Sequence, residues 1–286
     1  MTETQNGEKI FSLRVPMSHD QMAAAAHRFG WWHFCEHWLR QMRAYMGSIF
    51  GVGVAQPVLY LLAMGIGLGV VVDGATDTEA VLGMSYLHYI APALLMSTAL
   101  SAAMEENTFS IMSGFKWRYT YFAPQVTPLT PTQIAQGHAL GTTIRYTLSL
   151  AIYLAVLLAF GAVQGWASLW LLPIGVLTAC AIGLPVMGYA SGLETERGQF
   201  ALMNRLLVLP MMLFSGTFFP LETLPGFLQP IGWLSPLWHS VSLSRAVVTP
   251  LAIPPWLAAV HVSYLLALCL VGAWFARKHF NERLVD

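Results

Sequence analysis

Charged side chains are scarce in this sequence of 286 residues. Only 10% of the residues are Asp, Glu, Lys or Arg, whereas 56% are hydrophobic, and soluble domains carry about 25% charged residues. The 14 basic and 14 acidic residues give a formal net charge of zero, so no basic surface favours nucleic acid as a partner. A chain this poor in charge needs lipid rather than water around most of its surface.

Cysteine is rare, and the motifs that bind nucleotides or metals are missing. The three cysteines, Cys35, Cys180 and Cys269, lie far apart and show no metal-ligand spacing. No lysine follows glycine or precedes Ser or Thr, which excludes a P-loop because that motif ends in Gly-Lys-Ser or Gly-Lys-Thr. We therefore expect no catalytic residue, no metal, no cofactor and no ATP site on this chain.

Long apolar runs make up much of the sequence and predict an all-α polytopic membrane protein. Six runs reach or approach the roughly 20 residues that an α-helix needs to cross the hydrocarbon layer. They lie at residues 46–72, 86–104, 139–162, 167–191, 203–221 and 256–276. Lipid offers the backbone no hydrogen-bond partner, so each run must be helical. The small-residue pairs Gly47/Gly51 and Gly188/Gly192 predict close helix packing.

The spans carry no central Asp, Glu, Lys or Arg by this assignment. Ion-coupled carriers usually need such groups near the midplane of the membrane, so their absence argues against a secondary transporter. A wide, weakly polar path suits an amphiphilic or lipid-like substrate better.

The basic residues fall on one side of this six-span arrangement. Of the 14 Lys and Arg residues, all but Arg245 lie in the terminal segments or connections of that side. This bias predicts a bacterial inner-membrane protein with both termini in the cytoplasm. Residues 1–30 are polar and contain no apolar core followed by a cleavage site, so we expect a cytoplasmic tail rather than a signal peptide. Residues 31–286 are expected to form the transmembrane domain.

Two stretches outside the spans are unusually apolar. Residues 31–46 repeat apolar side chains every three or four positions, and they predict an amphipathic helix in the membrane interface. A cytosolic helix packed on protein is the alternative. Residues 222–250 are rich in Pro, Trp and Leu, and they predict short helices that re-enter the outer leaflet between spans five and six. The alternative is an interfacial cap without a role in transport.

The most specific pattern begins within the fifth span and continues past its end. Residues 209–225 read LPMMLFSGTFFPLETLP, and Leu234-Ser235-Pro236-Leu237 and Ser244-Arg245 come after them. This pattern resembles the signature of type-2 ABC exporter permeases, the ABC-2 transmembrane subunits, and especially those that export lipo-oligosaccharides and daunorubicin. The resemblance covers residues 30–286, and its specific part is the stretch 205–245.

The resemblance implies a transport subunit rather than an enzyme. In that family two permeases, identical or similar, pair with two copies of a separate ATPase, which binds ATP and magnesium. Together they move an amphiphilic or lipid-linked substrate, such as a lipo-oligosaccharide or a hydrophobic drug, out of the cytoplasm or inner leaflet. The interfacial helix and a cytoplasmic coupling helix, here within residues 119–136, would dock on the ATPase. The alternative is a membrane-embedded lipid-modifying enzyme that acts without an ATPase, which needs a cluster of interacting polar groups in the spans.

Two groups of site residues follow from the resemblance. The residues expected to couple the chain to the ATPase are Thr127, Pro128, Leu129, Thr130, Pro131, Glu105, Glu106, Arg40 and Arg43. The residues expected to shape the exit in the re-entrant region are Ser215, Gly216, Phe218, Phe219, Pro220, Leu224 and Pro225. For Glu105 and Glu106 the alternative role is to cap a helix end and set the topology.

Overall fold

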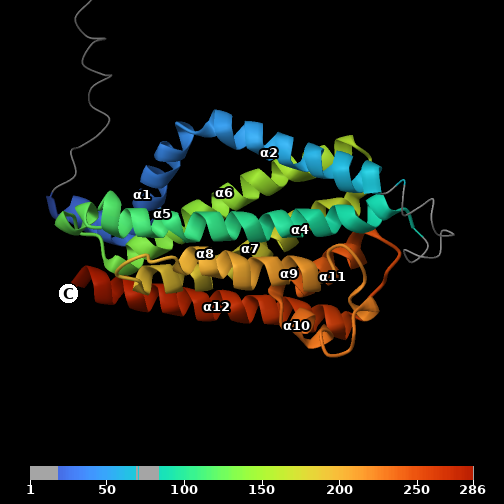
Figure 1. Ribbon diagram of the computed structural model, residues 1–286. Coiled ribbons are helices and arrows are strands. Elements are labelled where there is room, and N and C mark those ends of the chain that lie inside the picture. The colour runs from blue at the N-terminus through green and yellow to red at the C-terminus, as the bar shows by residue number, and fades with distance from the viewer. Residues whose placement is uncertain (1–18, 69, 71–83, 286) are drawn as a thin grey trace, which may run out of the picture.

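The computed structural model describes residues 19–68, 70 and 84–285. Every regular element within these residues is a helix. The long helices are α1 (His19–Arg43), α2 (Met46–Tyr60), α4 (Tyr86–Asn107), α6 (Pro131–Ala159), α7 (Leu171–Gly192) and α12 (Pro255–Val285). They form an elongated bundle in which α4, α6, α7 and α12 run side by side (Figure 1). The all-α prediction is confirmed over these residues.

Five helical segments in the described part of the chain are long and apolar enough to cross a membrane. They are Met46–Met64, Tyr86–Trp117, Pro131–Ala159, Trp166–Gly192 and Pro255–Val285. The segment predicted as the fifth span, 203–221, overlaps a shorter apolar helix, Gln199–Phe214. It is built from α8 (Gln199–Met203), the π-helical η6 (Asn204–Val208) and α9 (Leu209–Phe214). The end of the predicted first span, 46–72, lies outside the described residues.

Three spans are longer than the sequence analysis placed them, and the last of these runs from Pro255 to Val285. The second continues from α4 through α5 (Phe109–Met112) into the π-helical η3 (Ser113–Trp117), and the third begins at Pro131. Arg145 consequently stands halfway along α6. The expectation that no span carries a central charge is therefore wrong for α6. The bundle accommodates this charge because Arg145 forms an ion pair with Glu106 of α4.

The helices α7 and α12 make the most extensive contact in the bundle. A Cβ atom on Gly188 would lie 2.8 Å from the Phe275 Cβ and 3.0 Å from the Ala276 backbone nitrogen. Such close approach needs a residue without a side chain, so the packing prediction holds for this glycine and for Gly192, which faces His279. A Cβ atom on Gly47 or on Gly51 would have no neighbour within 4 Å among the described residues, apart from the local helix backbone.

We expect Gly188→Ala to destabilise the protein by about 1–2 kcal/mol, because the new methyl group meets backbone atoms of α12 that have no room to move. The matched control is Gly47→Ala, which adds the same methyl group in open space and should be neutral or slightly stabilising. Thermal unfolding of both variants in lipid nanodiscs measures the difference. Equal melting temperatures for the two variants would contradict the packing argument.

A bent arm made of α1 and α2 lies over α6 (Figure 1). The backbone of α1 is kinked at Phe29, and a short turn after Arg43 leads into α2. The start of α6 lies beside the end of α12, where the Thr132 hydroxyl donates a hydrogen bond to the Asn281 side-chain oxygen at 3.2 Å. The helix α1 and the C-terminal end of α12 therefore occupy the same end of the bundle (Figure 1).

Candidate functional site

The predicted coupling residues 127–131 form the turn that leads into α6, which we call the coupling turn. A single 3₁₀ turn, η4 (Ala123–Val126), precedes it. Thr130 caps α6: its hydroxyl accepts a hydrogen bond from the Gln133 backbone N–H, and the Gln133 side-chain oxygen accepts one from the Thr130 N–H. This reciprocal capping box, with Pro131 as the first helical residue, fixes the start of the helix.

Only part of the coupling turn is free to meet a partner protein. Thr127 and Pro128 are exposed. Leu129 is half-buried and packs in the hydrophobic cluster at this end of the bundle, where its side chain lies against Gly30 of α1. The turn therefore presents two residues outward and anchors itself through the third.

An aromatic cluster lies beneath the coupling turn. The buried ring of Tyr121 packs 4.7 Å from Phe115 and 5.1 Å from Phe280 of α12, measured between ring centroids. Its hydroxyl is 3.0 Å from Nδ1 of His138, and burial raises the pKa of Tyr121 so that the phenol stays neutral. The Arg283 guanidinium lies 4.2 Å over the Phe115 ring. These contacts join the loop that holds Tyr121 to α6 and α12, and together they form a packed layer beneath the coupling turn.

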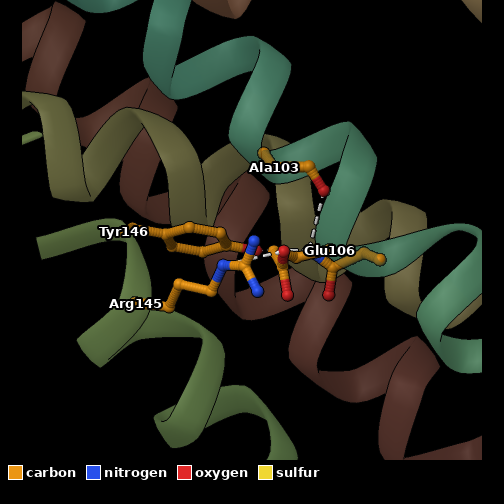
Figure 2. A network of polar contacts seen from close by, with 5 residues as sticks. Ala103, Glu106, Arg145 and Tyr146 are labelled. Atoms are coloured by element: carbon orange, nitrogen blue, oxygen red, sulfur yellow. Dashed lines mark hydrogen bonds and ion pairs between the residues drawn. The ribbon is translucent and has the colours of Figure 1, made fainter. Parts of the chain in front are cut away.

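The two predicted carboxylates have different environments. Glu105 is exposed, whereas the Glu106 side chain is only 5% exposed. A Glu106 carboxylate oxygen lies 2.9 Å from the Arg145 Nε, and Figure 2 shows Arg145 and Tyr146 reaching from α6 toward α4. The side chain of the next residue, Asn107, donates hydrogen bonds to the Tyr146 hydroxyl and to the Ala103 carbonyl. Glu106 thus joins two spans, a role that goes beyond capping a helix end.

The predicted basic residues of α1 lie in its last turn. Arg43 is exposed, and Arg40 forms an exposed ion pair with Glu36 at 2.7 Å. The hydrogen bond from Arg40 holds the pKa of Glu36 below its usual value. The contact of α1 with the coupling turn is made instead by Gly30, about three helical turns earlier. That Arg40 and Arg43 dock on the ATPase therefore remains a prediction.

The predicted exit residues begin where α9 ends. The buried Ser215 hydroxyl donates a hydrogen bond to the Ser235 hydroxyl at 2.6 Å, and Ser235 caps α11 (Pro236–Val248) by accepting from the Leu237 N–H. Gly216 has φ +71°, a left-handed conformation that favours glycine. The helix therefore stops at Phe214, and the chain turns back toward α11.

The remaining exit residues divide between interior and surface. Phe218 is half-buried, and its carbonyl accepts a hydrogen bond from the Tyr86 hydroxyl at 3.3 Å. Phe219 and Pro225 are exposed, while Leu224 is half-buried. Pro220 precedes the 3₁₀ turn η7 (Leu221–Thr223), and α10 (Gln229–Trp233) follows. The segment predicted to contain short helices does contain them.

Arg245 was not expected to belong to this site, but it holds the site together. Its side chain is buried, and its guanidinium lies 3.7 Å from the Tyr89 ring centroid. It donates hydrogen bonds to the carbonyls of Tyr89, at 3.2 Å, and Thr217, at 3.0 Å. One side chain of α11 thus connects α4 to the segment after α9, and only the folded arrangement reveals it.

Comparison with known proteins finds relatives of this chain. Nodulation protein J of Rhizobium leguminosarum bv. viciae is 29% identical over 252 residues, which cover 87% of this chain and 92% of the relative. Nodulation protein J of Rhizobium meliloti (strain 1021) is 25% identical over 258 residues, covering 89% and 95%. The probable multidrug ABC transporter permease YbhR of Escherichia coli (strain K12) is 25% identical over 167 residues, covering 57% and 44%.

The family profile described as "ABC-2 type transporter" matches residues 33–249, a stretch that contains the coupling turn, the Glu106–Arg145 pair and the segment after α9. The matched region is more than half of the chain. The chain is therefore an ABC-2 type permease and belongs to the ABC-2 type transporter family.

Proposed function

We propose that this chain is the transmembrane subunit of an ATP-driven exporter that moves an amphiphilic or lipid-linked substrate, a lipo-oligosaccharide or a hydrophobic drug. It works as a homodimer or with a similar permease, and two copies of a separate ATPase supply the energy. The chain itself carries no ATP site or other catalytic site. The match of 217 residues to the family profile carries this proposal.

The coupling turn supports the placement of the ATPase contact. Thr127 and Pro128 are exposed at the end of the bundle that also holds α1 and the C-terminal end of α12. The capping box and the aromatic cluster beneath the turn give it a fixed base, so a push on the turn is passed to α6 and α12 as a rigid movement. We assign Arg43, which is exposed in the last turn of α1, to the periphery of this contact. Glu105 is exposed but lies within the second span, so a contact of its carboxylate with the ATPase stays a prediction.

The orientation in the membrane follows from the charge bias. We place the end with the coupling turn in the cytoplasm, together with both termini, in the inner membrane of a bacterium. Gln199–Phe214 then serves as the fifth of six spans. Its 16 residues are short for a span, and α10 and α11 fill the remaining depth as re-entrant helices. The exit residues 215–225 lie at the mouth of the path.

The amphipathic half of α1 is proposed to lie in the membrane interface. One of its faces, with Phe34 and Cys35, is buried against α6 and the aromatic cluster. The opposite face carries Trp32, Arg40 and Arg43, which are exposed. Aromatic and basic side chains of this kind favour the headgroup layer.

Affinity purification from native membranes tests the proposal. We expect a tagged chain, solubilised gently, to bring down a soluble chain with a Walker motif in an equal amount. The alternative, a lipid-modifying enzyme that acts alone, predicts activity of the single purified chain without such a partner. Turnover of a lipid by the isolated chain, with no ATPase in the purified sample, would overturn the exporter assignment.

A further inference from the structure

A cleft of about 730 Å³ lies within the single chain, between the arm of α1 and α2, the α4–η3 segment, and α6. Its volume is in the range of pockets that hold a small molecule. The cleft is bordered by parts of three predicted spans, so it lies beside lipid rather than in a soluble domain.

Each of the three walls contributes a polar stripe. On α6 the stripe consists of His138, Arg145, Ser149 and Tyr153, whose spacing of seven, four and four residues places them on one helical face. At a rise of 1.5 Å per residue this stripe is about 22 Å long. It extends over much of the roughly 30 Å hydrocarbon layer.

The other two walls of the cleft also carry polar stripes. The stripe on α4 and its continuation consists of Thr98, Ser101, Glu105, Ser110 and Ser113. The stripe on the arm consists of His37, Gln41, Ser48 and Gln56. Polar side chains inside a membrane are costly and usually line a pathway or a ligand site, and three stripes that face one another are consistent with a site rather than chance composition.

The polar lining of the cleft gives way to apolar residues toward the start of α4 and the end of α6. Beyond Thr98 the helix α4 presents Leu94 and Leu95, and beyond Tyr153 the helix α6 presents Leu154, all of them in the hydrophobic core. The polar lining of the cleft therefore ends within the bundle, where apolar core residues of α4 and α6 take over.

The charges in the cleft cancel. Glu105 and Glu106 are balanced by Arg118 and Arg145, and Glu106 and Arg145 already pair with each other. The remaining polar groups are mainly hydroxyls, amides and imidazoles. Nε2 of His138 is buried and has no hydrogen-bond partner among the described residues. The walls therefore suit a ligand that offers many neutral hydrogen bonds and no net charge.

Aromatic side chains complete the lining. Trp38, Tyr45, Phe109 and Trp117 border the cleft beside the polar stripes. Aromatic faces bind the C–H faces of sugar rings, while hydroxyl and amide groups bind the ring hydroxyls. The combination favours a sugar-like headgroup over a phosphate, which would need an excess of Arg or Lys.

We propose that this cleft binds the uncharged, hydroxyl-rich headgroup of the exported amphiphile inside one protomer, with the apolar tail leaving past α2 into lipid. Exposed apolar side chains on α2, among them Val52, Val54 and Leu59, offer the tail a lipid-like surface. This inference deepens the proposed exporter function and rests on it. It places a loading site within the chain rather than between two chains.

Photolabelling of the intact chain in lipid nanodiscs tests the site. The probe is a dodecyl glycoside with a photoreactive diazirine on the sugar, and peptide mass spectrometry maps the adducts. We expect labelling within residues 98–113 and 138–153, reduced by excess dodecyl maltoside but not by dodecyl sulfate. Adducts spread evenly over the lipid-facing helices, or equal competition by both detergents, would overturn the site.

Matched variants sharpen the test. Tyr45→Phe removes one exposed hydroxyl from the cleft and should weaken competition by dodecyl maltoside about fivefold, while Ser149→Leu fills the cleft and should weaken it at least tenfold. The controls Tyr189→Phe and Ser263→Leu change exposed residues outside the cleft and should leave competition unchanged. Melting temperatures check that all four variants fold. Equal competition in the cleft variants and controls would overturn the proposal.

The two hypotheses can fail separately, because labelling of the cleft needs no ATPase. Specific labelling without a copurifying ATPase would support the cleft and contradict the exporter. A copurifying ATPase with no specific labelling would support the exporter and contradict the cleft.

Discussion

Glu106→Ala is expected to lower the free energy of unfolding by about 2–4 kcal/mol, because it leaves the Arg145 guanidinium without a counter-charge halfway along α6. The Arg145 side chain is 28% exposed toward the cleft, so water recovers only part of the lost interaction. Equilibrium unfolding in mixed micelles measures the change.

Two further variants separate the pair from the loss of a carboxylate alone. Glu105→Ala removes the neighbouring, exposed carboxylate and should change stability by about 0.5 kcal/mol or less. Glu106→Leu combined with Arg145→Met removes both charges and should recover most of the lost stability, because well-packed apolar residues can replace a buried ion pair. If the double variant is as unstable as the sum of the two single changes, the coupling between these residues is refuted.

Pro128→Asp is expected to reduce substrate-stimulated ATPase activity at least tenfold while the protein stays in the membrane at its normal level. Pro128 is exposed in the coupling turn, so the substitution costs little in the free chain. A carboxylate buried against a partner's surface would lose its hydration without gaining a partner, which weakens docking. Reconstituted permease and ATPase, assayed with and without substrate, measure the effect.

The control for this prediction is Gln164→Asp, an equally exposed residue in the connection after α6, whereas the coupling turn lies before the start of that helix. Leu129→Asp should also uncouple the two proteins, but Leu129 is half-buried against α1, so that variant is expected to lose stability as well. Full coupled transport by Pro128→Asp would disprove the assignment of the coupling turn.

Local sequence signals predicted the helical architecture well. Apolar runs identify the spans because lipid leaves a backbone no other choice than a helix. The start of α6 is also readable from the sequence, since Thr130 and Gln133 form a capping box with Pro131 between them. The break after Phe214 follows from Ser215-Gly216, although the apolar residues up to 221 had suggested a longer helix.

Long-range contacts account for what the sequence did not reveal. The second span had been expected to end at residue 104, because charged residues usually mark the edge of the membrane. Glu106 instead finds Arg145 on another helix, and this pairing is visible only once α4 and α6 lie together. The same holds for Tyr121 and Phe280, whose contact beneath the coupling turn joins the loop before α6 to α12. The aromatic run of residues 115–122 was the one signal that could have pointed to this cluster.

The enclosure of Arg245 sharpens the electrical asymmetry of the molecule. This side chain was the one exception to the bias of positive charge, yet in the fold an aromatic ring and two carbonyls cover it. Among the described residues, the end of the bundle that holds α10 and α11 therefore offers no free guanidinium to the anionic lipids of a nearby leaflet. In the described part of the chain, attraction by anionic lipid therefore acts mainly on the opposite end, which favours the orientation proposed above.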